Sequence, residues 1–289
     1  MTPQEARRRM IERGRRPGKA PRWQTPDSIE REYMRELEGI ADEINKEIEQ
    51  NLLPIIGDLV ASRDRDRGDA RTDEGWAEQL REIMDRTEVA VFRRLDQRRL
   101  RRLARDYGER TGKFNKRQAT RLAEAVFGVD VTLDEPWLKD KLEAFGNQNA
   151  SLIKDVGEQQ VNQVSRIANQ ALLEGKTNQA IVADIQKRLD IGKRRARLIA
   201  RDQVASLNAN LTKERQGSLG LRRYRWRNSD DERVRGNPDG RYPDAVPSHW
   251  DREGKIFSWD SPPSDGHPGE PILCRCWAEA VLEDIDPDQ

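Results

Sequence analysis

The sequence predicts a mostly α-helical N-terminal part followed by a small α+β C-terminal domain with a short antiparallel sheet. The helical prediction rests on apolar residues that recur at steps of three and four along much of residues 29–175, which is the period of one helix face. From Leu219 onward the sequence contains Gly, Pro, Trp and short apolar runs, which are typical of strands joined by turns.

Residues 1–28 predict a basic flexible arm. Residues 7–22 carry eight arginines and lysines but only one acidic residue. Pro17, Pro21 and Pro26 argue against a continuous helix, because proline removes a backbone donor and clashes with the preceding turn. Such an arm would be either a solvated tail or a segment that lies on DNA or a partner chain.

Residues 29–175 predict an elongated helical region. Its first helix begins near Ile29 and kinks or ends at Pro54, and residues 62–75 predict a charged loop with no periodic apolar residues. Further helices are expected over residues 76–105, 111–127 and 136–174.

Residues 176–284 predict the α+β domain, and residues 285–289 a short tail. Gly175 is expected to end the preceding helix and Thr177 to cap the next. The domain is expected to contain helices over residues 181–189 and 193–215 and strands over residues 221–227, 255–259 and 274–282.

The composition limits the classes of function. The chain is 36% charged, 35% hydrophobic and 6% aromatic, with a formal net charge of +1. This balance excludes an attraction of the whole chain to nucleic acid, so local clusters would have to supply one. No run of about 18 apolar residues is present, so we expect no membrane span. The basic N-terminus lacks the apolar segment of a secretory signal peptide.

The two histidines and two cysteines of the chain all lie within residues 249–276. Cys274 and Cys276 are separated by one residue, a spacing at which a disulfide is strained, so a disulfide framework is excluded and a reducing cytosol fits best. In a strand both cysteines point to the same face, and His249 and His267 could complete a structural zinc site from the loops.

A metal-free interpretation stays open beside the zinc interpretation. The cysteines could be small buried apolar residues, and the histidines could cap turns or bond the backbone. In either case we expect Cys274, Cys276 and His249 to lie within a few ångströms of one another. If the short strands form one sheet, the strand that carries the cysteines must lie beside the loop that carries His249.

Arginines form local clusters within residues 7–22, 93–105 and 193–201. Residues 93–105 contain seven arginines in thirteen positions, against a single aspartate. A solvated helix face explains such a run, and contact with phosphates or an acidic partner is the alternative. The candidate residues for nucleic-acid contact are Arg7, Arg8, Arg9, Arg98, Arg99, Arg101, Arg102, Arg194 and Arg195.

Four C-terminal segments occur in an order that carries a resemblance. They are RRARLIARDQVASLNANL, YRWRNSDDERVR, HWDREGKIF and HPGEPILCRC. Together they resemble the phage Mu F-like head morphogenesis family, the minor capsid proteins of tailed bacteriophages. The chain departs from the family pattern at Asp202 and Gln203, where the family usually carries Thr-Glu, and in the inserted NPDGRYPDAVPS before His249.

The resemblance implies a structural role without catalysis. Proteins of this family sit in few copies in or on the procapsid near the portal, and help assembly, DNA packaging or ejection. The implied partners are the portal protein, the major capsid or scaffolding protein, and packaged double-stranded DNA bound without sequence preference. The implied location is the phage head, and the host cytoplasm during assembly. No cofactor is implied beyond the zinc considered above.

Two alternatives belong to other classes. Asp230, Asp231, Glu232 and His249 could form a metal-dependent nuclease site, although no second histidine stands at nuclease spacing. The arginine clusters could also belong to a nucleic-acid-binding protein, although no helix-turn-helix or aromatic RNA-binding motif supports sequence reading.

Overall fold

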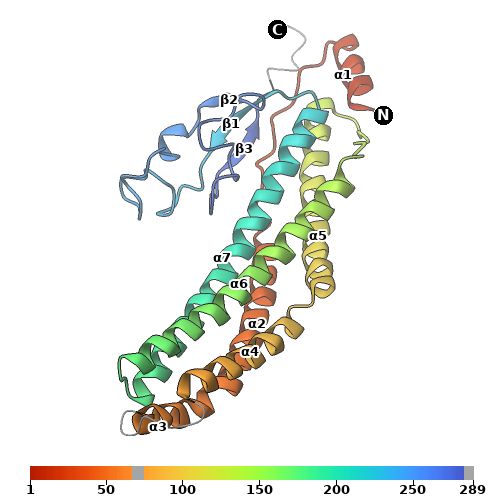
Figure 1. Cartoon of the computed structure of the whole chain (residues 1–289). Coiled ribbons are helices and arrows are strands. Elements are labelled where there is room, and N and C mark those ends of the chain that lie inside the picture. The colour runs from red at the N-terminus through yellow and green to blue at the C-terminus, as the bar shows by residue number, and fades with distance from the viewer. Residues whose placement is uncertain (67–74, 283–289) are drawn as a thin grey trace. The chain divides into compact units, whose positions relative to one another are not determined.

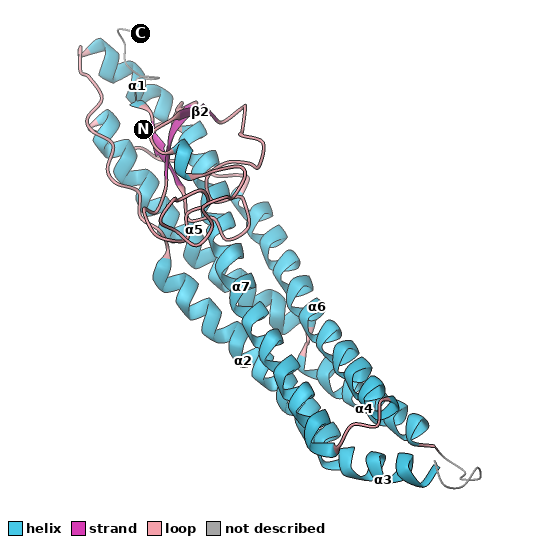
Figure 2. Cartoon of the chain, turned by 90° about the vertical axis from the view of Figure 1, so that its left-hand side faces the viewer, coloured by secondary structure: helices cyan, strands magenta, loops and turns pink. Residues whose placement is uncertain are grey.

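The computed structural model describes residues 1–66 and 75–282, and most of these residues are helical (Figures 1 and 2). The predicted fold class is confirmed, because long helices precede a three-stranded antiparallel sheet. None of the described helices is long and apolar enough to cross a membrane. The α-helices are α1 (Pro3–Glu12), α2 (Asp27–Leu52), α3 (Ile56–Asp66), α4 (Trp76–Arg94), α5 (Gln97–Phe127), α6 (Leu138–Leu173) and α7 (Asn178–Ser218).

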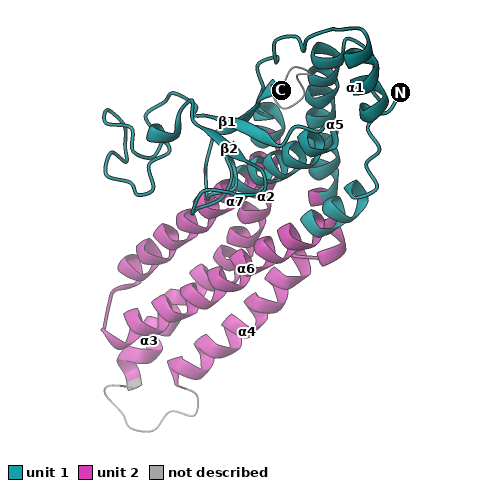
Figure 3. Ribbon diagram, turned by 90° about the horizontal axis from the view of Figure 1, so that it is seen from above, with its two compact units in different colours: residues 1–31, 105–145, 201–289 teal, residues 32–104, 146–200 magenta. Residues whose placement is uncertain are grey.

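The chain forms two compact units, and each is assembled from separate stretches of sequence (Figure 3). Unit 1 comprises Met1–Arg31, Arg105–Phe145 and Arg201–Gln289, and unit 2 comprises Glu32–Ala104 and Gly146–Ala200. This division differs from the expected contiguous regions 29–175 and 176–284, because α2, α5, α6 and α7 each contribute residues to both units. The expected tail, residues 285–289, lies outside the described residues.

Residues 1–28 are packed and partly helical, where the sequence analysis expected a flexible arm. Helix α1 begins with a capping box: Glu5 N donates to Thr2 Oγ1, and Thr2 N donates to the Glu5 carboxylate. Met10 and Trp23 are buried in an apolar cluster with residues of α5. The three prolines lie, as expected, in the non-helical segment between α1 and α2. Apolar burial therefore holds this basic segment against the rest of unit 1.

The first long helix, α2, follows the predicted apolar stripe. Tyr33, Leu37 and Ile44 are at most 1% exposed. Pro54 lies in a 3-10 turn, η1 (Leu53–Ile55), which separates α2 from α3, so the predicted break at Pro54 is confirmed. The first residues of the expected charged loop are helical and belong to α3, while residues 67–74 lie outside the described residues.

Two predicted helix boundaries were wrong. The helix expected over residues 76–105 is divided into α4 and α5, and α5 runs on through the helix expected at 111–127. The division falls at Asp96, whose Oδ1 accepts a hydrogen bond from Arg99 N at 2.7 Å and so caps the start of α5.

The two helices expected within residues 181–215 are one continuous helix, α7. Gly192 does not interrupt it, and a side chain there would come within 2.6 Å of Gln160 Oε1 on α6. The glycine thus leaves room for the end of the Gln160 side chain within unit 2. The predicted end and start before α7 are confirmed, because Gly175 has φ +76° and Ala180 N donates to Thr177 Oγ1.

The sheet has the order β2-β1-β3, with β1 (Arg223–Arg227) paired antiparallel to β2 (Ile256–Ser258) and to β3 (Trp277–Ala280). The register places Tyr224 opposite Phe257 on one side and Ala280 on the other. The strand expected over residues 274–282 begins at Trp277, so both cysteines lie in the extended segment directly before it.

A buried ion pair and its hydrogen bonds join α7 to α5 and to the loop that follows α5, all within unit 1. Arg215 is fully buried, and its Nε donates to Glu135 while its Nη1 donates to Gly112 O at 3.1 Å and to Asn115 Oδ1 at 2.7 Å. Asn115 in turn donates to Thr212 Oγ1 at 2.8 Å. Because these groups are bonded to one another away from water, removal of one member leaves others without partners.

Replacement of Arg215 by Ala should therefore lower the free energy of unfolding by about 3–5 kcal/mol, the usual effect of removing one member of a buried ion pair. Urea unfolding of the full chain measures this change. Lys116→Ala is the matched control, because Lys116 pairs with the same Glu135 carboxylate from a half-exposed position and should change stability by about 1 kcal/mol or less. Equal losses for the two variants would contradict the assignment.

Candidate functional site

Aromatic side chains of the sheet pack against a cluster formed by His249, Cys274 and Cys276, called here the His/Cys cluster. Along β1, Tyr224 and Trp226 are fully buried on one face while the arginines between them are more exposed. The ring of Trp226 meets the ring of His249 edge-on, with centroids 5.1 Å apart. Cys274 and Cys276 belong to the same apolar cluster as these aromatic residues. The alternation of β1 thus creates the apolar surface on which the cluster rests.

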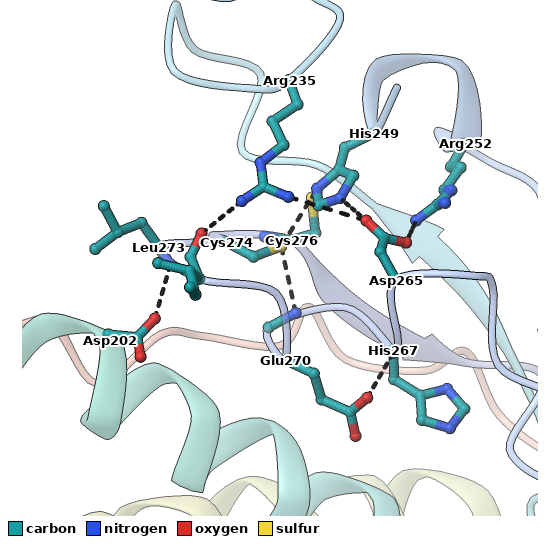
Figure 4. A network of polar contacts seen from close by, with 12 residues as sticks. Asp202, Arg235, His249, Arg252, Asp265, His267, Glu270, Leu273, Cys274 and Cys276 are labelled. Carbon is teal, nitrogen blue, oxygen red and sulfur yellow. Dashed lines mark hydrogen bonds and ion pairs between the residues drawn. The ribbon is translucent and has the colours of Figure 1, made fainter. Parts of the chain in front are cut away.

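The loop after β1 positions His249. The backbone N–H groups of His249 and Trp250 both donate to the carbonyl oxygen of Arg235, at 2.9 and 3.0 Å. The guanidinium of Arg235 donates to the carbonyl of Ile272 at 2.8 Å (Figure 4). Arg235 therefore ties the turn before His249 to the turn before Cys274.

A strained turn positions the two cysteines. Leu273 has φ +58°, a left-handed conformation that is unfavourable for a branched side chain. Its N–H donates to Asp202 Oδ1 on α7 at 2.7 Å, which offsets part of this strain (Figure 4). The chain then extends through Cys274 and Cys276 into β3.

His249, Cys274 and Cys276 converge, as the geometric argument predicted. The Nδ1 atom of His249 lies 3.5 Å from Cys274 Sγ and 3.6 Å from Cys276 Sγ. The three side chains are buried, with exposed fractions of 2%, 6% and 7%. Within residues 1–66 and 75–282, they form the group of His, Cys, Asp and Glu side chains that could share one metal ion.

Asp265 fixes the other edge of the His249 ring. Its Oδ2 atom lies 2.8 Å from His249 Nε2, and its Oδ1 atom accepts a hydrogen bond from Arg252 Nη1 at 2.6 Å (Figure 4). The carboxylate thus holds the proton of His249 on Nε2 and leaves Nδ1 as the atom that faces the sulfurs.

The electrostatics of the cluster favour a charged thiolate. A hydrogen bond from Cys276 and the proximity of His249 hold the pKa of Cys274 well below its ordinary value, whereas the same hydrogen bond and burial raise the pKa of Cys276 well above it. Burial alone would lower the pKa of His249, but the hydrogen bonds with Cys274 and Asp265 outweigh it and raise that pKa.

His267 does not lie with His249, Cys274 and Cys276, so its inclusion among the candidate metal ligands was wrong. Its Nδ1 atom lies 2.9 Å from the Tyr224 hydroxyl and its Nε2 atom 3.2 Å from Lys213 Nζ. Burial lowers the pKa of His267, in keeping with a neutral ring held between these partners. Its backbone N–H donates to Glu270, which shapes the turn that leads to the cysteines.

The residues considered for a nuclease site do not assemble among the described residues. Asp231 accepts hydrogen bonds from Arg233, and these outweigh burial and lower its pKa. Glu232 forms an ion pair with Arg241. Both acidic residues belong to charged turns, the structural alternative to a metal site.

The candidate arginines for nucleic-acid contact differ in their surroundings. Arg99 forms a two-pronged ion pair with Glu43, and Arg8 pairs with Glu12. Arg101 donates to Gln97, and Arg195 donates to Gln159. Arg7 is half-buried and Arg9 is exposed. Three further members are exposed and have no ion-pair partner within the described part of the chain: Arg98, Arg102 and Arg194.

Sequence reasoning did not identify three residues that build the site: Asp202, Arg235 and Asp265. Asp265 carried a usable signal, because it is an acidic residue in the loop between the two histidines. In the sequence Asp202 stands out only as a departure from the family pattern, and its contact with Leu273 spans 71 positions, so no local pattern reveals it.

The fold and the site define the class of this chain: a protein of long helices whose C-terminal module joins a small sheet to a buried His/Cys cluster. Residues 162–279 match the model of the family described as phage Mu protein F like protein, so the predicted resemblance is confirmed over these residues. The matched segment contains the complete cluster together with Asp202, Arg235 and Asp265.

One relative is a protein of Haemophilus influenzae (strain ATCC 51907 / DSM 11121 / KW20 / Rd) described as an uncharacterized protein. It is 36% identical over 163 residues, which cover 54% of this chain and 33% of the relative. The chain therefore spans about a third of the length of this curated relative. No solved structure gives a significant match.

Replacement of Asp202 by Ala should lower the free energy of unfolding by about 1.5–3 kcal/mol, because Leu273 N loses a charged acceptor while its backbone stays strained. Urea unfolding of the full chain measures the change. Asp202→Asn keeps an acceptor oxygen at the same place, so its free energy of unfolding should fall by less than that of Asp202→Ala. Hydrogen exchange of the amides around Leu273 should accelerate in Asp202→Ala. A variant as stable and as protected as the parent would show that this contact does not hold the turn.

Proposed function

We propose that this chain is a structural head morphogenesis protein of a tailed bacteriophage, a minor capsid component without catalytic activity. The observation that carries the proposal is the family match over residues 162–279, which contains all four segments quoted from the sequence. The local structure is compatible, because the matched residues form a compact module whose charged groups are largely paired with one another.

A role in scaffolding agrees better with the site than a role in catalysis. The His/Cys cluster is buried, and the candidate nuclease carboxylates are held in ion pairs on turns. A reaction site needs access for a substrate and groups that are free to move protons. The alternative of a metal-dependent nuclease therefore has no observation in its favour among the described residues.

The expected partners are a portal protein and the major capsid or scaffolding protein, and the expected location is the virion head, with the host cytoplasm as the place of assembly. Support comes from the family resemblance alone. The exposed arginines support a further contact, with packaged double-stranded DNA and without sequence preference, because they can neutralise phosphates but belong to no motif that reads bases.

Mass spectrometry of purified particles should find the chain in few copies per procapsid or virion. A tagged chain should also recover a portal protein from cells that are producing particles. Quantification against the major capsid protein of the same sample provides the copy number. If the chain occurs only outside particles in cells that assemble complete heads, the proposed function is wrong.

Binding to double-stranded DNA should be weak and should fall steeply with salt. Arg98 and Arg102 stand four residues apart on α5, so both can contact one backbone. Replacing both with Ala should flatten the plot of log affinity against log salt by up to about 1.8, since each phosphate contact contributes about 0.9. Titrations of random-sequence duplexes at several salt concentrations measure the slope.

The matched control removes both members of the ion pair between Arg99 and Glu43, which leaves the net charge unchanged. Glu43→Ala combined with Arg99→Ala should leave the salt slope of the parent chain nearly intact. A strong preference for one sequence, or an equal effect of the control, would contradict non-specific contact through Arg98 and Arg102.

A further inference from the structure

We propose that His249, Cys274 and Cys276 bind one Zn²⁺ ion that fastens the loops of the C-terminal module to β3. This goes beyond the proposed role in the phage head, because it assigns a metal and its ligands to residues of this chain whatever assembly the chain joins. The proposal rests on the separation of the three ligand atoms, on the groups that orient them and on their burial.

The separations match a tetrahedral zinc site. With Zn–N of about 2.05 Å, Zn–S of about 2.3 Å and a tetrahedral angle, the expected distance between a ligand nitrogen and a ligand sulfur is about 3.6 Å. His249 Nδ1 lies 3.5 Å from one sulfur and 3.6 Å from the other. All three ligand atoms lie within 4.8 Å of one another. One ion can therefore reach them without movement of the backbone.

The histidine is oriented as a ligand. A metal-bound imidazole almost always donates its other N–H to a carboxylate, a carbonyl or water, and this fixes which nitrogen faces the ion. His249 Nε2 has such a partner in Asp265 at 2.8 Å. Arg252 holds that carboxylate in place from its other oxygen at 2.6 Å. This chain of contacts aims Nδ1 at the two sulfurs.

The sulfurs also have the surroundings of metal-bound thiolates. Cys274 Sγ accepts hydrogen bonds from the backbone N–H groups of Gly269 and Cys276, both at 3.4 Å. Gly269 has φ +90°, and a side chain there would come within 2.8 Å of Ala209 Cβ, so the loop approaches α7 closely enough to aim its N–H at the sulfur. Donors of this kind offset the negative charge of a thiolate.

The ligand set selects the metal. Two thiolates and one imidazole suit zinc, whereas Mg²⁺ and Ca²⁺ require oxygen ligands. Zinc binding releases the thiol protons to solvent. One ion can take both sulfurs and Nδ1 as ligands at the same time.

A small ligand such as water would fill the fourth coordination position of the zinc ion. Among the described residues, no further His, Cys, Asp or Glu joins the group. A cavity of about 40 Å³ borders both cysteines, and a cavity of this size can hold a water molecule. Because the three protein ligands are buried and come from the loop of His249 and from the segment before β3, the ion would link these two parts of the module.

The test uses the purified full chain. Elemental analysis should find about one zinc ion per chain, and replacement of zinc by Co²⁺ should produce the near-ultraviolet absorption of a cobalt–thiolate bond. Both signals should disappear in Cys274→Ser combined with Cys276→Ser. His267→Gln is the matched control, because His267 is 2% exposed, as is His249, but lies outside the group of ligands. This variant should keep the full metal content.

Two further measurements test the proposal even if the double-serine variant fails to fold. Both cysteines of the parent chain should resist alkylation until a chelator removes the metal. Asp265→Asn should keep the same ligands but weaken zinc affinity by about 10–100-fold in competition with a chelating dye. A folded parent chain that contains no zinc and takes up no Co²⁺ overturns the proposal, as does full zinc content in the double-serine variant. Neither result bears on the presence of the chain in particles, so the two proposals fail separately.

Discussion

Buried hydrogen bonds from α7 hold the C-terminal module in place, and much of unit 1 depends on them. Gln216 donates to the carbonyl of Ala278 in β3 and accepts from the indole N–H of Trp259, both at 3.2 Å. Asp202 holds the turn at Leu273 from the same helix. Directional contacts of this kind fix the sheet more tightly than apolar burial alone, because an unmade buried hydrogen bond costs free energy.

The fold class could be predicted from periodicity, because the residues that line a helix face or a strand face are close in sequence. The alternation of Tyr224 and Trp226 with arginines predicted β1, and Gly175 followed by Thr177 predicted the end of one helix and the start of α7. The break at Asp96 was missed because a capping side chain competes with an apolar stripe that continues across it. The continuity of α7 was missed because the role of Gly192 depends on a neighbouring helix, which the sequence does not display.

The candidate site was only partly predictable for the same reason. The clustering of all His and Cys residues in one window, together with the need for the strands to pair, was enough to bring His249 to the cysteines. His267 has the same residue type and the same window, yet it faces Tyr224 and Lys213 instead. Which of two histidines turns toward the sulfurs depends on Asp265 and on Arg235, whose contacts arise only once the loops have folded.

The assembly of unit 1 from three separate stretches has a consequence during translation. Met10 and Trp23 find some of their apolar neighbours on α5, and others, such as Leu221, only at the start of the C-terminal module. At about 5–20 residues per second, the roughly 200 residues between Trp23 and Leu221 take about 10–40 s to leave the ribosome. During that interval the apolar face of α1 lacks its contacts with Leu221 and the C-terminal module. A chaperone or another partner therefore has time to bind this face before unit 1 is complete.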